Sequence, residues 1–296
     1  MFKFNFIRES VDNTEANAQN ESVDVDNKYD KCFEIIPTAE QIENASLQKE
    51  IELKSISFGK FGKVYHVPVD EILDTLTEES DEINRAENNH SDLVAGVYEG
   101  GAKIWECTHD LGELLCELKI IEHFANKKVL DLGCGAGILG ILALQNGAKV
   151  HFQDYNKAVL QHITIPNVLV NIDQKSSFAE RCRFYSGDWS SYISETENEN
   201  QTFDFILTSE TIYNIQNYDK IINVLTTKLK PNGVCYLAAK SHYFGVGGNV
   251  RSFENILLSK CPQFQSEIVF SCKENVSREI LKISFKNIQR DSMLEH

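Results

Sequence analysis

The chain has 296 residues, 42% of them hydrophobic, and its 29 basic and 44 acidic side chains give a formal net charge of −15. This length is ample for one α/β domain with a large core, and the acidic balance argues against a nucleic-acid-binding surface. No apolar run approaches the roughly 18 residues of a membrane-spanning helix, and the eight cysteines form no Cys-x-x-Cys pair, so neither a metal site nor a disulfide scaffold is expected.

The acidic charge is concentrated near the N-terminus, where the first 90 residues hold 20 acidic and 9 basic side chains. Residues 1–30 are rich in Asn, Asp, Glu and Ser, a composition typical of a solvated segment, and we predict a disordered acidic tail there. Residues 31–95 contain strand-like patches such as Val-Tyr-His-Val at 64–67, and we interpret them as a partly ordered extension. The main domain is expected over 96–290.

The stretch 129–137 reads Val-Leu-Asp-Leu-Gly-Cys-Gly-Ala-Gly and continues into Ile-Leu-Gly-Ile-Leu-Ala-Leu. This pattern predicts a buried parallel strand, a tight turn and an apolar helix. Gly133, Gly135 and Gly137 remove three Cβ atoms from the turn, so backbone N–H groups and the helix N-terminus can approach a ligand closely. We therefore expect a nucleoside-containing cofactor at this turn.

Two classes of cofactor use such a turn. Read from Gly135, the residues up to Gly140 fit the glycine pattern of dinucleotide-binding proteins. Read from Asp131, they fit the Asp-x-Gly-x-Gly-x-Gly turn of S-adenosylmethionine-dependent methyltransferases. The register favours the methyltransferase, because Gly133 already begins the turn and Gly140 falls inside the helix, where it serves helix–sheet packing.

A second strand is expected over 149–154, and it ends in an acid. Asp154 lies about 20 residues after the first glycine, the spacing of a carboxylate that accepts hydrogen bonds from both ribose hydroxyls. The structural alternative is a cap for the next helix. Tyr155 and Asn156 follow directly and would line the same wall.

A third strand is predicted from Arg183 onward, and it ends in Gly187-Asp188-Trp189. The carboxylate of Asp188 is placed to accept the exocyclic amine of an adenine, and the indole of Trp189 is placed to cover the base. A role for the indole in the protein core is the alternative.

A fourth strand is expected over 203–210, so that acids end four successive strands, at Asp131, Asp154, Asp188 and Glu210. Since ligands in open parallel sheets bind beyond the carboxyl ends of the strands, these acids indicate one site.

A fifth strand over 234–240 follows the turn signal Lys-Pro-Asn-Gly at 230–233. The Gly-rich loop at 241–249 lacks the Gly-Lys-Ser/Thr ending of a phosphate cradle, which argues against nucleoside triphosphate binding. Strand-like runs at 264–272 and 279–286 predict a terminal hairpin, which suits a methyltransferase sheet better than a second mononucleotide-binding half.

Several segments together resemble the histidine-specific protein methyltransferases, a branch of the seven-β-strand enzymes that modifies a histidine of the third large-subunit ribosomal protein. The resemblance runs from about Tyr98 to Ser252, and its segments are 103–108, 131–137, 151–156, 165–168, 209–214 and 239–248. The glycine turn is common to all such methyltransferases. The sequences Ser-Glu-Thr-Ile-Tyr-Asn and Tyr-Phe-Gly-Val-Gly-Gly are specific to a much smaller group, and they carry the resemblance to this family. One departure is Asn249, where a third glycine is expected.

The resemblance implies an α/β fold, a Rossmann-like seven-stranded class I methyltransferase sheet with an antiparallel C-terminal hairpin. It also implies S-adenosyl-L-methionine as cofactor, S-adenosyl-L-homocysteine as product, and a basic ribosomal protein as substrate, with an effect on ribosome biogenesis or translation. We expect a monomer of the cytoplasm and nucleus, with no nucleic-acid or membrane partner. The expected cofactor-binding residues are Ile104, Trp105, Glu106, Cys107, Thr108, Asp131, Gly133, Gly135, Gly137, Gln153, Asp154, Tyr155, Asn156, Gly187, Asp188, Trp189 and Ser209.

The acceptor chemistry indicates two further residues. A histidine with a pKa of about 6.5 is mostly neutral at pH 7, so one ring nitrogen already has a free lone pair. A carboxylate that accepts the N–H of the other nitrogen would fix the tautomer and stabilise the imidazolium that forms. Related enzymes carry an acid-x-x-aromatic motif here, and Glu210 and Tyr213 match it, with Glu210 as the carboxylate and Tyr213 shaping the acceptor slot. Capping of a following helix is the alternative for Glu210.

Other functions remain compatible with these residues. A lysine-directed or small-molecule methyltransferase would use the same cofactor site, although a lysine acceptor must first lose a proton from a pKa of about 10.4. A non-catalytic binding module with the methyltransferase fold is the third possibility.

Overall fold

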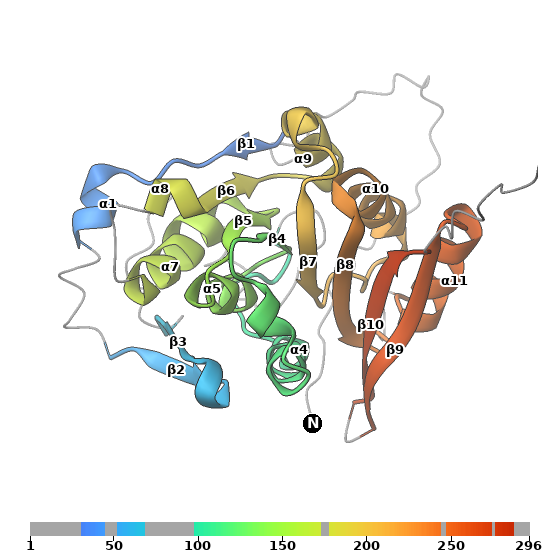
Figure 1. Cartoon of the computed structure of the whole chain (residues 1–296). Coiled ribbons are helices and arrows are strands. Elements are labelled where there is room, and N and C mark those ends of the chain that lie inside the picture. Colours follow the sequence, from blue (N-terminus) through green and yellow to red (C-terminus); the bar gives the residue numbers. More distant parts are fainter. Residues whose placement is uncertain are drawn as a thin grey trace, which may run out of the picture.

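The structure is a computed structural model that describes residues 31–44, 52–68, 98–172, 178–243, 247–273 and 276–286. The acidic tail expected over 1–30 lies outside these ranges. In the described residues, eight strands form one sheet in the order β1-β6-β5-β4-β7-β8-β10-β9 (Figure 1). The strands are β1 (Phe33–Glu34), β4 (Lys128–Leu132), β5 (Lys149–Asp154), β6 (Cys182–Ser186), β7 (Phe203–Ser209), β8 (Leu229–Lys240), β9 (Phe264–Cys272) and β10 (Arg278–Phe285).

The five central strands run parallel, and the hairpin of β9 and β10 closes the sheet by antiparallel pairing of β10 with β8. This order, with the third, second and first core strands followed by the fourth, fifth, seventh and sixth, is that of a class I methyltransferase. The predicted seven-stranded sheet and its C-terminal hairpin are therefore confirmed. The eighth strand, β1, pairs antiparallel with β6 and is only two residues long, too short to leave a pattern in the sequence.

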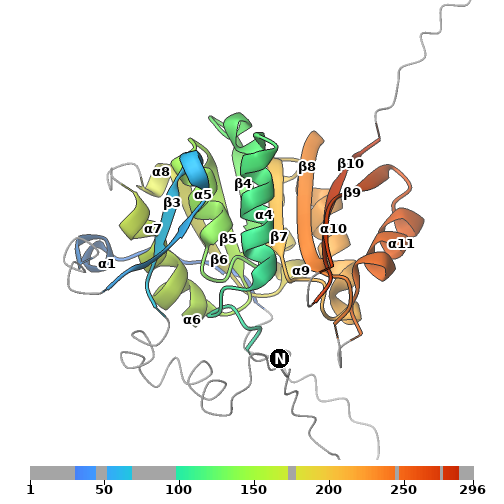
Figure 2. The same ribbon diagram turned by 90° about the horizontal axis from the view of Figure 1, so that it is seen from below.

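Helices cover both faces of the sheet, as Figure 2 shows from below. The side of α4, α5 and α7 holds one apolar cluster, and the side of α9, α10 and α11 holds another. The helices are α1 (Ala39–Asn44), α4 (Glu106–Glu117), α5 (Ile138–Gln145), α6 (Lys157–Val159), α7 (Ile165–Asn171), α8 (Phe178–Arg181), α9 (Trp189–Glu195), α10 (Tyr218–Lys228) and α11 (Val250–Lys260), with a π-helical stretch, Leu160–Thr164, between α6 and α7. None of these described helices has the length and apolarity needed to span a bilayer.

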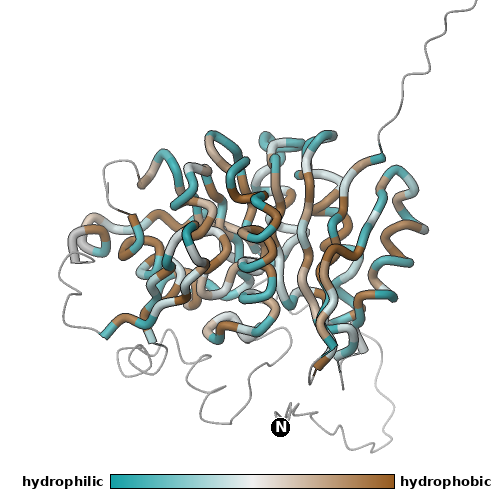
Figure 3. The backbone as a smooth tube through the Cα atoms, turned by 60° about the horizontal axis from the view of Figure 1, so that its bottom comes forward, coloured by the Kyte–Doolittle hydropathy of each residue, from teal (hydrophilic) through white to brown (hydrophobic). Residues whose placement is uncertain are grey.

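Strand β4 contributes apolar side chains to both clusters because it is pleated. Val129 of β4 packs on the α5 side and Leu130 on the α10 side, because successive strand side chains point to opposite faces. Asp131 therefore faces α5, as Val129 does. Helix α5 is buried over all of its first seven residues. Figure 3 shows hydrophobic and hydrophilic stretches alternating along the helices and strands.

The N-terminal extension contributes a two-stranded sheet of β2 (Lys54–Ser57) and β3 (Lys63–His66) beside α7. The side chain of Asn171 accepts from the backbone N–H of Tyr65 and donates to its carbonyl, at 2.9 and 2.7 Å. One helical turn earlier, Asn167 accepts from the N–H of Val67 at 2.9 Å. Strand β3 thus forms where the Val-Tyr-His-Val patch predicts one, and helix amides satisfy its outer edge.

The fifth core strand differs from its prediction at its start. Strand β8 begins at Leu229 and includes the Lys-Pro-Asn-Gly sequence that was interpreted as a turn. Its pairing with β7 shifts there, since Phe203 faces Leu229 whereas Phe205 faces Val234. Strand β8 therefore has three more residues than β7 between these two pairs, and the turn predicted at 230–233 is instead an irregular stretch of the strand.

Candidate functional site

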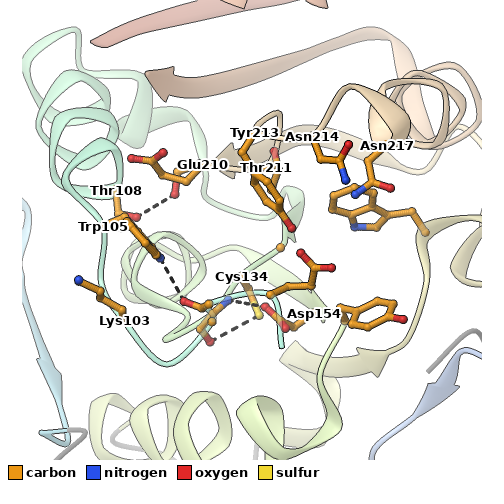
Figure 4. A pocket seen from close by; sticks show the side chains of 18 of the residues that line it. Lys103, Trp105, Thr108, Cys134, Asp154, Glu210, Thr211, Tyr213, Asn214 and Asn217 are labelled. Atoms are coloured by element: carbon orange, nitrogen blue, oxygen red, sulfur yellow. Dashed lines mark hydrogen bonds between the residues drawn. The ribbon is translucent and has the colours of Figure 1, made fainter. Parts of the chain in front are cut away.

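A cavity of about 320 Å³ opens at the carboxyl ends of the parallel strands (Figure 4), where open α/β sheets bind ligands. It is lined by the rim loop at 99–105, the glycine turn, the ends of β5 and β6, and the segment after β7. The lining residues are Glu99, Gly100, Gly101, Lys103, Ile104, Trp105, Thr108, Gly133, Cys134, Gly135, Ala136, Ile138, Asp154, Tyr155, Gly187, Asp188, Trp189, Ser209, Glu210, Thr211, Tyr213, Asn214, Gln216, Asn217 and Lys220.

Most residues predicted for the site line this cavity. Among the predicted cofactor-binding residues, those in the lining are Ile104, Trp105, Thr108, Gly133, Gly135, Asp154, Tyr155, Gly187, Asp188, Trp189 and Ser209, and both predicted catalytic residues, Glu210 and Tyr213, join them. Glu106, Cys107, Asp131, Gly137, Gln153 and Asn156 are not in the lining. Contact of each individual residue with a cofactor stays a prediction.

The glycine turn has the geometry that only glycine adopts easily. Gly133 and Gly135 have φ of 64° and 49°, in the left-handed region. A Cβ on Gly133 would lie 2.6 Å from Cγ2 of Thr211, and one on Gly135 would lie 2.8 Å from the carbonyl oxygen of Gly101. Bare backbone is therefore needed on both sides of the turn, toward the segment after β7 and toward the rim loop.

The first part of the rim loop, with Glu99, Gly100, Gly101 and Lys103, lines the cavity but was not predicted from the sequence, whereas Ile104 and Trp105 were. The indole nitrogen of Trp105 donates to the carbonyl of Gly100 at 3.1 Å and folds the loop back on itself. The backbone N–H of Glu99 donates to Asn156 after β5, at 3.0 Å, which ties the loop to the sheet. The paired glycines at 100–101, directly before the Trp105 segment, were the available signal.

Asp154 stabilises the glycine turn through a hydrogen bond to its backbone. One carboxylate oxygen accepts from the N–H of Gly135 at 2.9 Å, and the other accepts from the N–H of Asn156 at 3.1 Å. Burial raises the pKa of Asp154 to about 6, against the opposing effect of these backbone donors. The carboxylate still lines the cavity, as the predicted ribose contact requires.

The side-chain amide of Gln153 fixes the position of the Trp189 indole in the cavity wall. The indole nitrogen donates to Gln153 at 2.7 Å, and the amide nitrogen of Gln153 donates to the carbonyl of Gly187 at 2.8 Å. Gln153 is fully buried, so it orients the indole from behind. Cover of a ligand is thereby supported for Trp189 over a purely core role, because the ring lines the cavity.

The carboxylate of Asp188 has two partners within the protein. One oxygen caps α9 by accepting from the N–H of Ser190 at 2.8 Å, and the other lies 2.6 Å from Nζ of Lys220. Lys220 also lines the cavity. It lies in a helix and not at the end of a strand, so it was not among the predicted site residues. Hydrogen bonding of Asp188 to an adenine stays a prediction.

Asp131 turns away from the cavity toward α5. Its carboxylate accepts from the N–H of Gly140 at 2.8 Å, and it is only 2% exposed. Burial raises its pKa to about 8. A Cβ on Gly140 would lie 2.3 Å from the ring of Phe152, which confirms that this glycine serves helix–sheet packing.

Glu210 begins the segment after β7 with an unusual backbone, at a φ of 59°. The hydroxyl of Tyr243 donates to one carboxylate oxygen, and Nζ of Lys240 lies 3.7 Å from the other. Burial raises the pKa of Glu210, while Lys240, Tyr243 and the Cys107 thiol favour the ionised form. No regular α-helix begins directly after Glu210, and it is Asn214 that caps the short 3₁₀ turn Ile215–Asn217, so a capping role for Glu210 is not supported.

The Gly-rich loop is hydrogen-bonded to the segment that follows β7. The N–H of Gly248 donates to the carbonyl of Tyr213 at 2.9 Å, and Gly247 forms a bridge with Asn214. A Cβ on Gly248 would lie 2.1 Å from the carbonyl oxygen of Ile212, so only glycine allows this approach. Asn249, the departure from the expected third glycine, caps α11 by accepting from the N–H of Ser252 at 2.7 Å.

S-adenosylmethionine fits this cavity. The bare backbone of the turn lets a ligand approach closely, the indoles of Trp105 and Trp189 offer flat apolar surface, and the carboxylates of Asp154 and Asp188 offer hydrogen-bond acceptors. The methyltransferase family reported next supports S-adenosylmethionine as the cofactor.

Comparison with known proteins gives relatives of two kinds. The chain is 40% identical over 248 residues to "Histidine protein methyltransferase 1 homolog" of Bos taurus, covering 75% of this chain and 66% of that one. It is 44% identical over 198 residues to the protein of the same name from Dictyostelium discoideum, covering 66% and 61%. It is 29% identical over 180 residues to "EEF1A lysine methyltransferase 3" of Xenopus tropicalis, covering 60% and 71%.

The chain thus spans less than two thirds of the length of the two histidine relatives. A solved TehB-like SAM-dependent methyltransferase from Corynebacterium glutamicum is 14% identical at a TM-score of 0.45, covering 71% of this chain and all of that one. A family model described as "Lysine methyltransferase" matches residues 90–256, more than half of the chain. The chain therefore belongs to this methyltransferase family.

Proposed function

We propose that the chain is an S-adenosylmethionine-dependent protein-histidine N-methyltransferase. The observation that carries the proposal is that Glu210 and Tyr213, which line the cavity, are hydrogen-bonded to Tyr243 and Gly248 of the Gly-rich loop. The two segments are the most specific motifs of the resemblance, and they contact each other. The 40–44% identity to proteins named histidine protein methyltransferase 1 homolog supports the same acceptor.

The protein's part in this chemistry is to position groups and exclude water. When bound, the cofactor supplies a methyl group on a sulfonium, which is an excellent leaving group. A neutral imidazole already has a free lone pair, so no residue has to remove a proton first. Tyr213, 9% exposed, forms the wall of the acceptor slot between Glu210 and Asn214 (Figure 4).

Glu210 acts on the imidazolium that forms. Its carboxylate is turned toward Tyr243 and Lys240, so its stabilising effect in this arrangement is electrostatic and acts through a buried wall of low polarity. A direct hydrogen bond to the second imidazole nitrogen would use the oxygen that faces away from Tyr243, which is buried and has no hydrogen-bond partner among the described residues.

A basic protein is the substrate class that the charge of the chain supports. The net charge of −15 attracts a cationic partner over distances of about a Debye length, roughly 8–10 Å. A ribosomal protein of the large subunit fits this description, and we place the enzyme as a monomer in the cytoplasm and nucleus, where such proteins are made and assembled.

The test uses purified chain, cofactor labelled in its methyl group, and large-subunit ribosomal proteins from cells that lack the enzyme. After digestion to single amino acids, we expect the label on methylhistidine. Label on methyllysine alone, or no label on protein, contradicts the proposal. Glu210→Gln serves as the low-activity control for contaminating methyltransferases.

A further inference from the structure

Lys240 is a buried cation directly behind the acceptor side of the cavity. It is the last residue of β8 and is 4% exposed. Its Nζ lies 3.7 Å from a carboxylate oxygen of Glu210 and 3.6 Å from one of Glu106. The same atom lies 5.0 Å from the ring centroid of Trp105, in the geometry of a cation–π contact. Glu210 and Trp105 both line the cavity, and Lys240, which is not itself in the lining, contacts both of them.

A lysine is rarely buried unless it is paired, so this position calls for a reason. The arrangement gives Glu210 an internal cation on one carboxylate oxygen and the hydroxyl of Tyr243 on the other. One oxygen of Glu210 is therefore hydrogen-bonded to Tyr243, and the other is paired at 3.7 Å with Lys240 but has no hydrogen-bond partner among the described residues. A substrate ammonium that approached Glu210 would meet the like charge of Lys240 already paired with the carboxylate.

We propose that Lys240 determines acceptor specificity by disfavouring a cationic lysine side chain and leaving a neutral imidazole unaffected. This inference rests on the proposed histidine methyltransferase function and deepens it. A lysine acceptor has a pKa of about 10.4 and arrives charged at neutral pH. A like charge within about 4–6 Å disfavours it, whereas a neutral imidazole meets no such penalty.

The experiment compares two acceptor peptides on wild-type enzyme and on Lys240→Met, which keeps the length of the side chain and removes its charge. One peptide carries the acceptor histidine located in the ribosomal-protein experiment, and the other has lysine in its place. We expect the ratio of kcat/KM for the lysine peptide to that for the histidine peptide to rise about tenfold or more in Lys240→Met. An unchanged ratio in a variant that still binds cofactor overturns the proposal.

Lys228→Met is the matched control, because Lys228 is the other fully buried lysine of the described chain. Its Nζ donates to the carbonyl of Thr196 and, at 3.0 Å, to the side chain of Asn200, below α9 and outside the cavity lining. Loss of that charge is expected to lower stability and to leave the lysine-to-histidine ratio as it is. A rise of the ratio in Lys228→Met would mean that loosening the fold is enough, and it would overturn the specific role of Lys240.

Two further measurements separate charge from structure. In Glu210→Gln/Lys240→Met the lysine gain is expected to disappear, because the gain requires a carboxylate that has lost its internal partner. With wild-type enzyme and S-adenosylhomocysteine, calorimetry should show a norleucine peptide binding more tightly than the lysine peptide, and this holds even if Lys240→Met does not fold. Tighter binding of the lysine peptide contradicts the inference.

The proposed function and this inference fail in different ways. If wild-type enzyme labels no histidine, the proposed function fails. If it labels histidine while the variant ratio and the norleucine comparison show no effect of charge, only the role of Lys240 fails.

Discussion

The hydroxyl of Tyr243 donates to a carboxylate oxygen of Glu210, 2.5 Å away, and accepts from the backbone N–H of Lys240 at 3.1 Å. One phenol therefore joins the Gly-rich loop, the end of β8 and the segment after β7. Glu210 has a left-handed backbone that costs energy in a non-glycine residue, and its buried carboxylate prefers to be neutral. Tyr243 opposes both tendencies, since it holds the side chain in place and favours its charge.

Tyr243→Phe should test this role. The variant leaves the N–H of Lys240 and one oxygen of Glu210 without the phenol, at a cost of about 1–3 kcal/mol in the free energy of unfolding. Loss of a donor to the carboxylate raises the pKa of Glu210 further, so the acid limb of the kcat profile should move to higher pH. The control is Tyr236→Phe, at a buried tyrosine of β8 that is outside the cavity lining. Identical pH profiles for the two variants would contradict the role.

Glu210→Gln should separate binding of the cofactor from turnover. Cofactor affinity is expected to stay within a few-fold, while turnover falls on the order of a hundredfold because the imidazolium loses its carboxylate. In the wild type, activity is lost as the pH falls through the raised pKa of Glu210 and through that of the acceptor histidine, about 6.5. In Glu210→Gln the activity should depend only on the pKa of the acceptor histidine. Unchanged turnover would remove Glu210 from the mechanism.

Strands β4, β5, β7, β9 and β10 could be predicted to within a residue or two, because a buried strand is an apolar run whose end is marked by a polar residue. Strand β8 is the exception, since it begins five residues before its predicted start. Strand β5 has the predicted bounds, and β9 does as well. What the sequence could not reveal is where each strand-end acid points. Asp154 faces the cavity and Asp131 faces α5, because the pleat and the turn together decide the direction of a side chain.

The rim loop shows a second limit. Gly100 and Gly101 come before the first core strand, and no periodicity connects them with Gly135. They meet because α4 and β4 together return the chain to the same edge of the sheet. A Cβ on Gly135 would lie 2.8 Å from the carbonyl oxygen of Gly101, which shows how closely the two segments approach. The same holds for Tyr243 and Glu210, whose motifs could be named separately although their contact could not be predicted.

Gly248→Ala is expected to push the Gly-rich loop away from the segment after β7. The new Cβ would lie 2.1 Å from the carbonyl oxygen of Ile212 and 2.3 Å from that of Tyr213, and backbone must move to relieve both. We expect a loss of about 1–3 kcal/mol in stability and a rise in KM for the protein substrate. Calorimetry should show cofactor affinity within a few-fold of wild type. Gly59→Ala is the control, because no atom lies within 4 Å of its new Cβ. Its φ of 59° makes alanine costly there, so it should lower stability and leave the KM for the protein substrate unchanged.

Both tryptophans of the chain, Trp105 and Trp189, line the cavity, so the indole fluorescence of the protein reports on one site. Titration with S-adenosylhomocysteine should change the emission and saturate at the dissociation constant found by calorimetry. Gln153→Leu removes the acceptor that orients the indole of Trp189, and it should reduce both the change and the affinity. A full-sized change in Trp189→Phe would show that Trp105 alone senses the ligand.

Asp131→Asn should remove a pH dependence of stability without harm to the fold. Burial raises the pKa of Asp131 to about 8, well above the value of about 3.9 in an unfolded chain. Between these values the folded protein holds a proton that the unfolded chain has lost, so the contribution of this carboxyl to stability falls as the pH rises and levels off above 8. The asparagine keeps an oxygen for the N–H of Gly140 and does not titrate.

The measurement is urea unfolding of both proteins at several pH values. The two should have similar stability near pH 4, and Asp131→Asn should gain on the wild type by up to about 1.4 kcal/mol per pH unit as the pH rises toward 8. Cofactor affinity should change only a few-fold, because Asp131 is not in the cavity lining. A difference that grows in the opposite direction would mean that Asp131 is ionised in the folded protein, and a large loss of affinity would return it to the cofactor site.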